Sequence, residues 1–219
     1  ACKNNMPILW SNDNQIQDIA NFVNKQNYKK VYALGNDERF THNAKQYINN
    51  VELIKEMNKR IVHRGPDAEG IYVDDNVALG QRRLSIIDLE GGNQPIYNKD
   101  KSILIVYNGE VYNYKELKEE LTEYEFQTNS DTEVILHGYE KWGKELPKKL
   151  RGMFAYAIYD KNKNEIFISR DHFGIKPLYY YQNKDVILFG SEIKSFLAHP
   201  KFKKELNNEV ARYLVAKLD

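Results

Sequence analysis

Cysteine and long apolar runs are nearly absent from this sequence of 219 residues. Its single cysteine, Cys2, cannot form an intrachain disulfide and supplies too few thiolates for a structural zinc site. No stretch approaches the roughly 20 apolar residues that span a bilayer, and the first residues lack the basic start and apolar centre of a signal peptide. We therefore expect a cytoplasmic protein that has no membrane partner.

A charge excess of either sign is missing as well. The chain has 32 Lys and Arg against 31 Asp and Glu, which gives a formal net charge of +1. Nucleic acid is therefore not an expected partner, because binding a polyanion generally requires a basic surface. Glycine-rich phosphate loops and the His spacing of metalloenzymes are also absent from the sequence, so we expect neither a nucleotide nor a metal site in this chain.

What remains is the composition of a globular protein, with 42% apolar and 29% charged residues. Apolar residues at spacings of three and four predict helices at 51–62, 116–121 and 131–142. Short β-branched and aromatic segments between Asn, Asp and Gly breaks predict strands at 70–73, 77–80, 84–89, 103–107, 154–160, 165–170, 178–182 and 187–190. The least readable part, 1–50, shows one helix-like stretch at 15–23 and one strand-like stretch at 30–34. Helices beside blocks of antiparallel-looking strands indicate the α+β class.

Three local features could bind a ligand, and each has a structural alternative. Asn108-Gly109 follows an apolar strand and could simply be a turn with positive φ. Arg83 could clamp a carboxylate in bidentate fashion, or it could be a surface arginine paired with an acid. Asp131 follows Ser130 and could hold an ammonium group, or it could belong to a helix cap. Taken one at a time, these features do not decide between ligand binding and structure.

The order of the motifs is more specific than any one of them. Seven segments follow one another: His63-Arg64-Gly65-Pro66-Asp67, Arg83-Leu84-Ser85-Ile86-Ile87-Asp88, Asn108-Gly109-Glu110-Val111-Tyr112-Asn113, Ser130-Asp131-Thr132-Glu133, Gly152-Met153-Phe154-Ala155, Arg170-Asp171-His172-Phe173-Gly174 and Gly190-Ser191-Glu192-Ile193-Lys194. This series resembles class II glutamine amidotransferases, and within them the N-terminal domain of the glutamine-hydrolysing asparagine synthetase group. The resemblance divides the chain into a divergent segment at 1–50, the amidotransferase domain at 51–200 and the start of a connector at 201–219.

The resemblance implies a fold and a set of site residues. The fold is a four-layer αββα sandwich of the N-terminal-nucleophile hydrolase type, with antiparallel sheets. Arg83 would bind the α-carboxylate of glutamine, and the backbone around Ile87 would line the pocket. The α-ammonium group would lie between Glu110 and Asp131. The side-chain amide of Asn108 and the backbone N–H of Gly109 would form the oxyanion hole. Asn108 and Gly109 would therefore bind the substrate and also act in catalysis.

The nucleophile of the family is a cysteine that begins the mature chain and uses its own α-amino group as the base. Cys2 is the candidate nucleophile because it lies near the start of the sequence. It follows Ala1, however, so its backbone nitrogen is a peptide amide and cannot act as the base. Three explanations stay open: the true N-terminus lies elsewhere, the first segment is a divergent insertion, or the glutaminase activity has been lost. Cys2 is then either a nucleophile or an inert thiol.

The resemblance also implies the reaction and its partners. We expect hydrolysis of glutamine to glutamate and ammonia for amide transfer to aspartate in asparagine biosynthesis, and the alternative is a catalytically dead module that binds glutamine or acts as a scaffold. Residues 206–214 look like the connector into a synthetase domain, and the S-G-G-x-D-S loop of an ATP pyrophosphatase is absent. ATP and Mg²⁺ are therefore expected only in a separate synthetase domain or subunit. The sequence is also compatible with a homodimer.

Overall fold

The computed structural model describes residues 7–8, 32–33, 38–74, 76–84 and 93–205 of the chain. Its helices are α2 (Glu38–Lys59), α3 (Tyr114–Glu120) and α4 (Asp131–Trp142), with 3₁₀ turns η2 (Val62–Arg64), η3 (Gly143–Lys148) and η4 (Ile193–Ala198). Its strands are β1 (Pro7–Ile8), β2 (Tyr32–Ala33), β3 (Ala68–Val73), β4 (Ala78–Arg83), β5 (Ile96–Tyr97), β6 (Ile103–Val111), β7 (Gly152–Asp160), β8 (Glu165–Arg170), β9 (Tyr179–Gln182) and β10 (Ile187–Gly190). The α+β class predicted from the sequence is confirmed.

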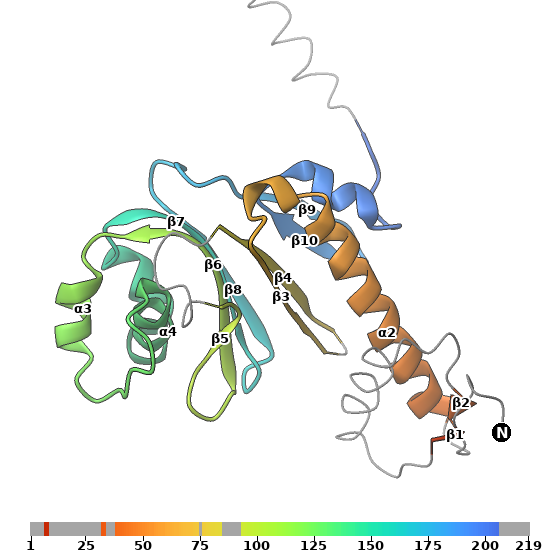
Figure 1. Cartoon of the computed structure of the whole chain (residues 1–219), viewed down its shortest axis with the longest axis horizontal. Helices are drawn as coiled ribbons and strands as arrows, with labels where there is room; N and C mark the ends of the chain where they lie inside the picture. The colour runs from red at the N-terminus through yellow and green to blue at the C-terminus, as the bar shows by residue number, and fades with distance from the viewer. Residues whose placement is uncertain (1–6, 9–31, 34–37, 75, 85–92, 206–219) are drawn as a thin grey trace, which may run out of the picture.

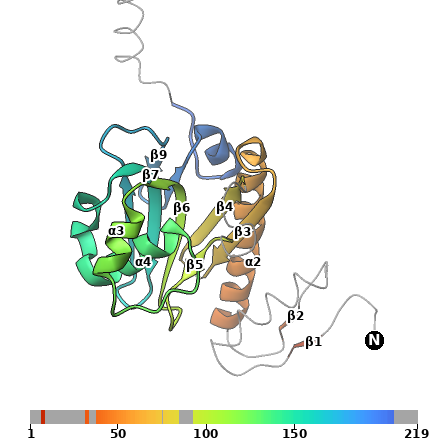
Figure 2. The ribbon, with the colours of Figure 1, turned by 60° about the vertical axis from the view of Figure 1, so that its left-hand side comes forward.

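These elements form four layers, which Figures 1 and 2 show side by side. Helices α3 and α4 cover one face of a four-stranded antiparallel sheet in the order β5-β6-β7-β8. The antiparallel pairs β3-β4 and β9-β10 lie against the other face, and α2 covers them from outside. This arrangement is the αββα sandwich expected from the sequence.

Three clusters of buried apolar side chains fill the three interfaces between these layers. The largest joins α4 to the four-stranded sheet and includes Ile135 and Ile158. The second lies between the two strand layers and includes Leu79 and Leu104. The third joins α2 to the β3-β4 pair through Val51, Ile54 and Val73. Strand β6 contributes to the first two clusters because successive side chains of a strand point to opposite faces.

Helix α2 and strand β6 extend furthest beyond the bounds that the sequence pattern predicted. Helix α2 begins at Glu38 rather than near residue 51, and the apolar spacing of three and four also extends upstream in the sequence, through Phe40, Ala44, Tyr47 and Ile48. Strand β6 continues from Tyr107 through Val111, and Val111 pairs with Gly152 of β7. The interpretation of Asn108-Gly109 as a turn with positive φ is therefore wrong, because both residues pair with β7 inside the sheet.

Most other boundaries agree with the sequence pattern. Helix α4 and strand β8 begin and end at the predicted residues. The predicted strand at 84–89 and the helix-like stretch at 15–23 lie almost wholly outside the described residues, and Leu84 itself is not in a strand. Within the described part of the chain, no helix combines the length and the apolar content needed to cross a membrane.

Candidate functional site

Hydrogen bonds join the sequence motifs to one another in pairs. The guanidinium of Arg82 donates from Nε to the carbonyl of Gly65 at 2.8 Å and from Nη2 to that of Pro66 at 3.2 Å. A side chain on Gly65 would place its Cβ about 2.7 Å from the carbonyl oxygen of Arg82, so glycine lets the two segments touch. The first and second motifs are thus held together beside strand β4.

Two buried polar side chains join the later motifs. The Asp171 carboxylate accepts backbone N–H bonds from Phe154 at 3.2 Å, Ile175 at 2.9 Å and Lys176 at 3.0 Å. Burial opposes the charged form of Asp171, but these backbone N–H groups outweigh it and lower its pKa. Asn113 makes the other link, because its amide donates to the carbonyl of Lys149 at 2.9 Å. These contacts fix the ends of β6, β7 and β8 beside one another.

Asp131 occupies the junction between α4 and β6. It is the first residue of α4, and the Ser130 side chain caps that helix by accepting from the N–H of Thr132 at 3.1 Å. The Oδ2 atom of Asp131 accepts from the hydroxyl of Tyr107 at 2.7 Å and from the N–H of Val111 at 2.9 Å. The cap predicted at Ser130 is confirmed, and the Asp131 carboxylate reaches across to the strand that carries Asn108, Gly109 and Glu110.

Strand β6 presents these three residues in different environments. The side chains of Tyr107 and Val111 belong to the cluster under α4, so by alternation Asn108 and Glu110 face the opposite layer. Asn108 is half-buried and Glu110 is exposed. Gly109 lies so close to β7 that a Cβ would come about 2.7 Å from the Cα of Phe154, which gives this glycine a packing role in addition to the predicted oxyanion role.

Arg83 is buried at the end of β4, with 9% of its surface exposed. Its Nη1 atom approaches Oδ1 of Asn93 at 3.4 Å, and its backbone carbonyl accepts from the N–H of Asp67 at 3.1 Å. The surface position that the alternative interpretation gives Arg83 is therefore wrong. A buried guanidinium can bind a planar carboxylate strongly, because little water competes for its donors.

A cavity of about 270 Å³ lies between the two strand layers and under α2. Strands β4 and β10 line opposite parts of it, and Asn108, Tyr107 and Tyr156 contribute from the four-stranded sheet. Of the predicted site residues that the structure describes, only Asn108 lines this cavity. Arg83, Glu110 and Asp131 lie outside its lining, so the structure joins Asp131 to β6 without enclosing the whole predicted set in one pocket. Cys2 and Ile87 lie outside the described residues.

Sequence reasoning missed Tyr107, Asn113 and the role of Asp171. Tyr107 directly precedes the third motif, Asn113 is the last residue of that motif, and Asp171 lies in the sixth motif, but the sequence pattern assigns none of the three a role. The signal that could have found Asp171 was an acid directly after a strand and before a glycine, which is a common position for a side chain that caps a turn. The hydrogen bond of Tyr107 to Asp131 could not be predicted from the spacing of residues in the sequence.

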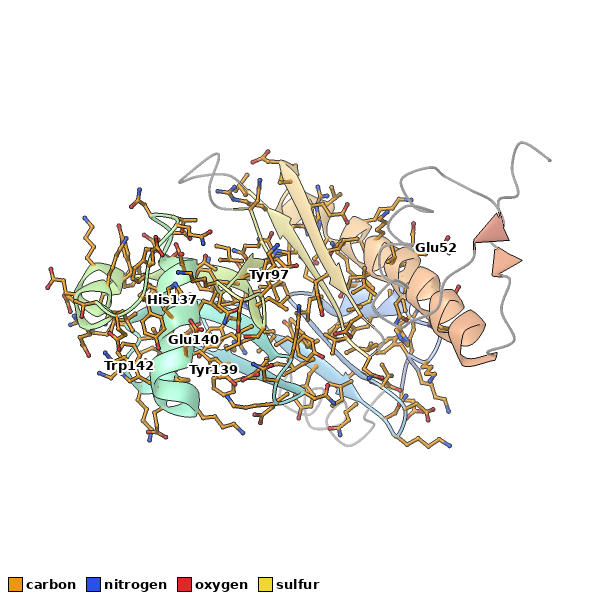
Figure 3. The ribbon with its side chains drawn as sticks, turned by 90° about the horizontal axis from the view of Figure 1, so that it is seen from below. Glu52, Tyr97, His137, Tyr139, Glu140 and Trp142 are labelled. Carbon is orange, nitrogen blue, oxygen red and sulfur yellow. The ribbon has the colours of Figure 1, made fainter. Side chains whose placement is uncertain are left out.

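A second buried polar cluster lies on α4 around His137, which Figure 3 labels, and includes Glu133 of the fourth motif. His137 approaches Glu140 at 2.7 Å and Glu133 at 3.6 Å, and its ring stacks on Tyr124 at 4.8 Å between centroids. Burial alone would lower the pKa of His137, but the two carboxylates raise it to about 9. Burial likewise opposes ionised Glu133, whose hydrogen bonds lower its pKa to about 2. This cluster holds a charged histidine inside the helix layer.

No group of three or more His, Cys, Asp and Glu side chains suited to a metal ion occurs among the residues that the structure describes. The arrangement at the ends of β4 and β6 has a different chemical character. The end of β4 carries the buried guanidinium of Arg83, and the Asp131 carboxylate is held by two donors of β6. Such a set suits an amino acid, which carries a carboxylate and an ammonium group on one carbon.

A sequence comparison assigns the chain to a protein family. The glutamine amidotransferase domain family matches residues 40–218, so the chain belongs to that family. The structure of glutamine phosphoribosylpyrophosphate amidotransferase from Bacillus subtilis superimposes with a TM-score of 0.57 at 21% identity, over 67% of this chain and 40% of that one. At this identity the likeness shows the fold, and it agrees with the αββα sandwich.

A search of curated proteins finds relatives of this chain among the glutamine-hydrolysing asparagine synthetases. Glutamine-hydrolysing asparagine synthetase 1 of Bacillus subtilis is 51% identical over 158 residues, which cover 71% of this chain and 25% of that protein. Asparagine synthetase B of Escherichia coli is 45% identical over 152 residues, or 67% of this chain and 27% of that protein. The chain therefore spans about a quarter of the length of these relatives.

Proposed function

We propose that this chain is a glutaminase domain that hydrolyses glutamine to glutamate and ammonia for amide transfer to aspartate in asparagine biosynthesis. The observation that carries the proposal is the contact of Asp131 with β6, which brings a carboxylate to the strand of Asn108, Gly109 and Glu110. The identity of 45–51% to glutamine-hydrolysing asparagine synthetases supports aspartate as the acceptor.

In this proposal the charges of glutamine set the roles of the binding residues. The buried guanidinium of Arg83 pairs with the α-carboxylate, while Asp131 and Glu110 receive the α-ammonium group. The backbone around Ile87 completes the wall of the pocket. Asn108 and the N–H of Gly109 donate to the carboxamide oxygen when its carbon becomes tetrahedral, and removing one such donor typically slows a reaction about 10²–10³-fold.

Cys2 is the proposed nucleophile. Its thiolate would attack the carboxamide carbon, and the tetrahedral intermediate would collapse to a thioester with release of ammonia. Water would then hydrolyse the thioester to glutamate and free the thiol. A base must accept the thiol proton, and a free α-amine at Cys2 would have a suitable pKa, near 7.7–8.0. Removal of Ala1 would create that amine.

The remaining partners of this reaction lie outside the chain. We place activation of the acceptor, with its ATP and Mg²⁺, in a synthetase domain or subunit, because the matched relatives are about four times longer than the aligned region. The glutaminase domain itself then needs no cofactor. A cytoplasmic location is supported by the single cysteine, which suits a reducing compartment.

The alternative function is a module that binds glutamine without hydrolysing it. Its support is the sequence around Cys2, where the nitrogen of the cysteine is a peptide amide. Such a module would keep the contacts of Arg83 and Asp131 but would lack a nucleophile with an adjacent base. Binding and turnover must therefore be measured separately.

The test is to incubate the purified chain with glutamine, follow glutamate release, and record the intact mass in the same samples. Alkylation of Cys2 and the Cys2→Ala variant should abolish glutamate release and leave glutamine binding in place. Arg83→Lys is expected to weaken binding, because an ammonium group cannot replace the bidentate guanidinium.

Each result selects one function. Glutamate release that depends on Cys2, together with a mass that lacks Ala1, supports the proposed mechanism. Binding without glutamate release favours the alternative. A chain that neither binds nor hydrolyses glutamine contradicts both functions.

A further inference from the structure

Tyr107 makes a contact that the assigned roles leave unexplained. Its side chain is 5% exposed, and its hydroxyl donates to Oδ2 of Asp131 at 2.7 Å. The N–H of Val111 donates to the same oxygen at 2.9 Å. Both donors come from β6, one on each side of Asn108-Gly109-Glu110, so the carboxylate is positioned relative to those three residues.

Two donors on one oxygen fix the orientation of a carboxylate. Rotation about the bond to the carboxylate carbon would break both hydrogen bonds at once. Among the described residues, no side chain or backbone group donates to Oδ1 of Asp131, although both oxygens can accept. Within the described part of the chain, one oxygen of a rigidly held carboxylate is therefore left to receive a ligand.

Tyr107 is itself held in place. Its N–H donates to Oε1 of Gln94 at 2.6 Å, and it pairs in register with Tyr156 of β7. Burial, followed by the charge of Asp131, raises the pKa of Tyr107 far above its ordinary value, so the phenol stays protonated and remains a donor. The hydroxyl can therefore orient Asp131 throughout the pH range in which an enzyme of this kind would act.

Helix α4 does not need this contact for its attachment. Val134, Ile135 and Leu136 already pack against the sheet in the largest apolar cluster. At the start of the helix, Glu133 accepts from the N–H groups of Gln127 and Thr128 at 2.8 and 2.7 Å. A buried phenylalanine would pack in the place of Tyr107 without requiring a polar partner, so the hydroxyl calls for a role beyond packing.

We propose that Tyr107 is a positioning residue, whose hydroxyl acts with the N–H of Val111 to aim the Asp131 carboxylate at the α-ammonium group of glutamine. The inference rests on the proposed function, because it takes glutamine as the ligand. It adds a residue to the recognition of the amino group and gives the tyrosine no contact with the substrate.

The experiment compares two ligands in calorimetric titrations of the full chain. One ligand is glutamine, and the other is glutaramate, which has the same carboxylate and carboxamide but no α-amino group. Tyr107→Phe should weaken glutamine binding about tenfold, since a hydrogen bond to a charged group is lost. Glutaramate binding should stay within about twofold of wild type, because the ammonium contact is absent from that complex.

A matched control comes from the opposite strand. Tyr156→Phe removes a hydroxyl from a buried tyrosine that pairs with Tyr107 but makes no hydrogen bond to Asp131, so it should change neither affinity. Asp131→Asn keeps an acceptor for both donors but removes the charge, and it should bring the affinity for glutamine down to that for glutaramate. If Tyr107→Phe unfolds in buffer, the same titrations are run in trimethylamine N-oxide, which favours the compact state.

The outcomes separate the two proposals. A selective loss of glutamine affinity in Tyr107→Phe supports the positioning role. Equal losses for both ligands, or no loss for either, overturn that role, while glutamate release by the wild-type chain still supports the proposed function. If the wild-type chain binds neither ligand, the proposed function fails and the positioning role fails with it.

Discussion

Gly109 and Gly152 allow β6 and β7 to approach each other more closely than side chains would permit. A Cβ on Gly109 would lie about 2.7 Å from the Cα of Phe154, and one on Gly152 about 2.9 Å from the Cα of Val111. Both neighbours are backbone atoms, which cannot move without distorting the strand pair. The two glycines therefore keep the strand with the candidate oxyanion residues straight and tightly paired.

Gly109→Ala is expected to destabilise the protein by about 1–3 kcal/mol, because the added methyl group must push the strands apart. Urea unfolding followed by circular dichroism measures the change. Gly190→Ala is the control, since the nearest atom to its Cβ would be the side-chain hydroxyl oxygen of Ser195 at 3.1 Å, which is farther away than the backbone atoms beside Gly109. Equal losses in the two variants would contradict the packing role of Gly109.

His137 makes stability depend on pH in the alkaline direction. Its pKa of about 9 in the folded protein lies above the ordinary value near 6.5. The stabilisation from its charge is therefore complete below about pH 6.5 and is lost as the pH rises through about 9. Glu133, with a pKa lowered to about 2, keeps its partner charge over this whole window.

His137→Gln should lower stability at pH 6.5 by about 3 kcal/mol, because it leaves two carboxylates without their cation. The variant should also lose most of the decline in stability that the wild type shows between pH 6.5 and pH 9. Urea midpoints measured across this range test both points. His172→Gln alters an exposed histidine and should keep the wild-type slope, whereas a slope unchanged in His137→Gln would show that other groups cause it.

At the scale of elements, the loop between β8 and β9 depends on Asp171. Its carboxylate accepts four backbone N–H groups, one from Phe154 of β7 and three from the loop, at Phe173, Ile175 and Lys176. Phe154 pairs with Gly109, so the same carboxylate connects the loop to the strand of the candidate site. The loop and the site should therefore change together when this carboxylate is removed.

Asp171→Ala is expected to cost about 2–3 kcal/mol and to speed amide hydrogen exchange in residues 173–176 and at Phe154. Hydrogen-exchange mass spectrometry at neutral pH measures the effect by segment. Asp100→Ala is a suitable control, because this exposed acid makes a similar turn contact with the N–H of Ser102 but lies in the loop before β6. Exchange that stays slow in 173–176 would argue against the carboxylate as the anchor.

Elements with strong local signals could be predicted from the sequence, and contacts between elements could not. Helix α4 was placed to the residue because Ser130 marks its start and apolar spacing continues to Trp142. The extension of β6 through Asn108-Gly109 was missed because pairing with β7 overrides the local turn preference of that dipeptide. The contact between Tyr107 and Asp131 joins residues 24 positions apart and follows from how α4 packs on the sheet.

At the scale of the whole molecule, the described core runs from Val51 to Phe196. All three apolar clusters lie within these limits, and α2 supplies one side of the third. Strands β1 and β2 pair with each other and with none of the other described strands. The layers from α2 to α4 should therefore behave as one cooperative unit, in agreement with the family match at 40–218.

A chain that begins at Glu38 tests this boundary and the role of Cys2 together. Its thermal midpoint should lie within about 3 °C of the full chain, which is about the shift that a loss of 1 kcal/mol produces in a domain of this size. A chain that begins at residue 60 should lose the cooperative transition, because Val51 and Ile54 no longer cover the β3-β4 pair. If the chain from Glu38 still releases glutamate from glutamine, Cys2 is not the nucleophile. If it binds glutamine with full affinity but has lost a turnover that the full chain shows, the catalytic group lies in residues 1–37 and the binding site lies in the layered domain.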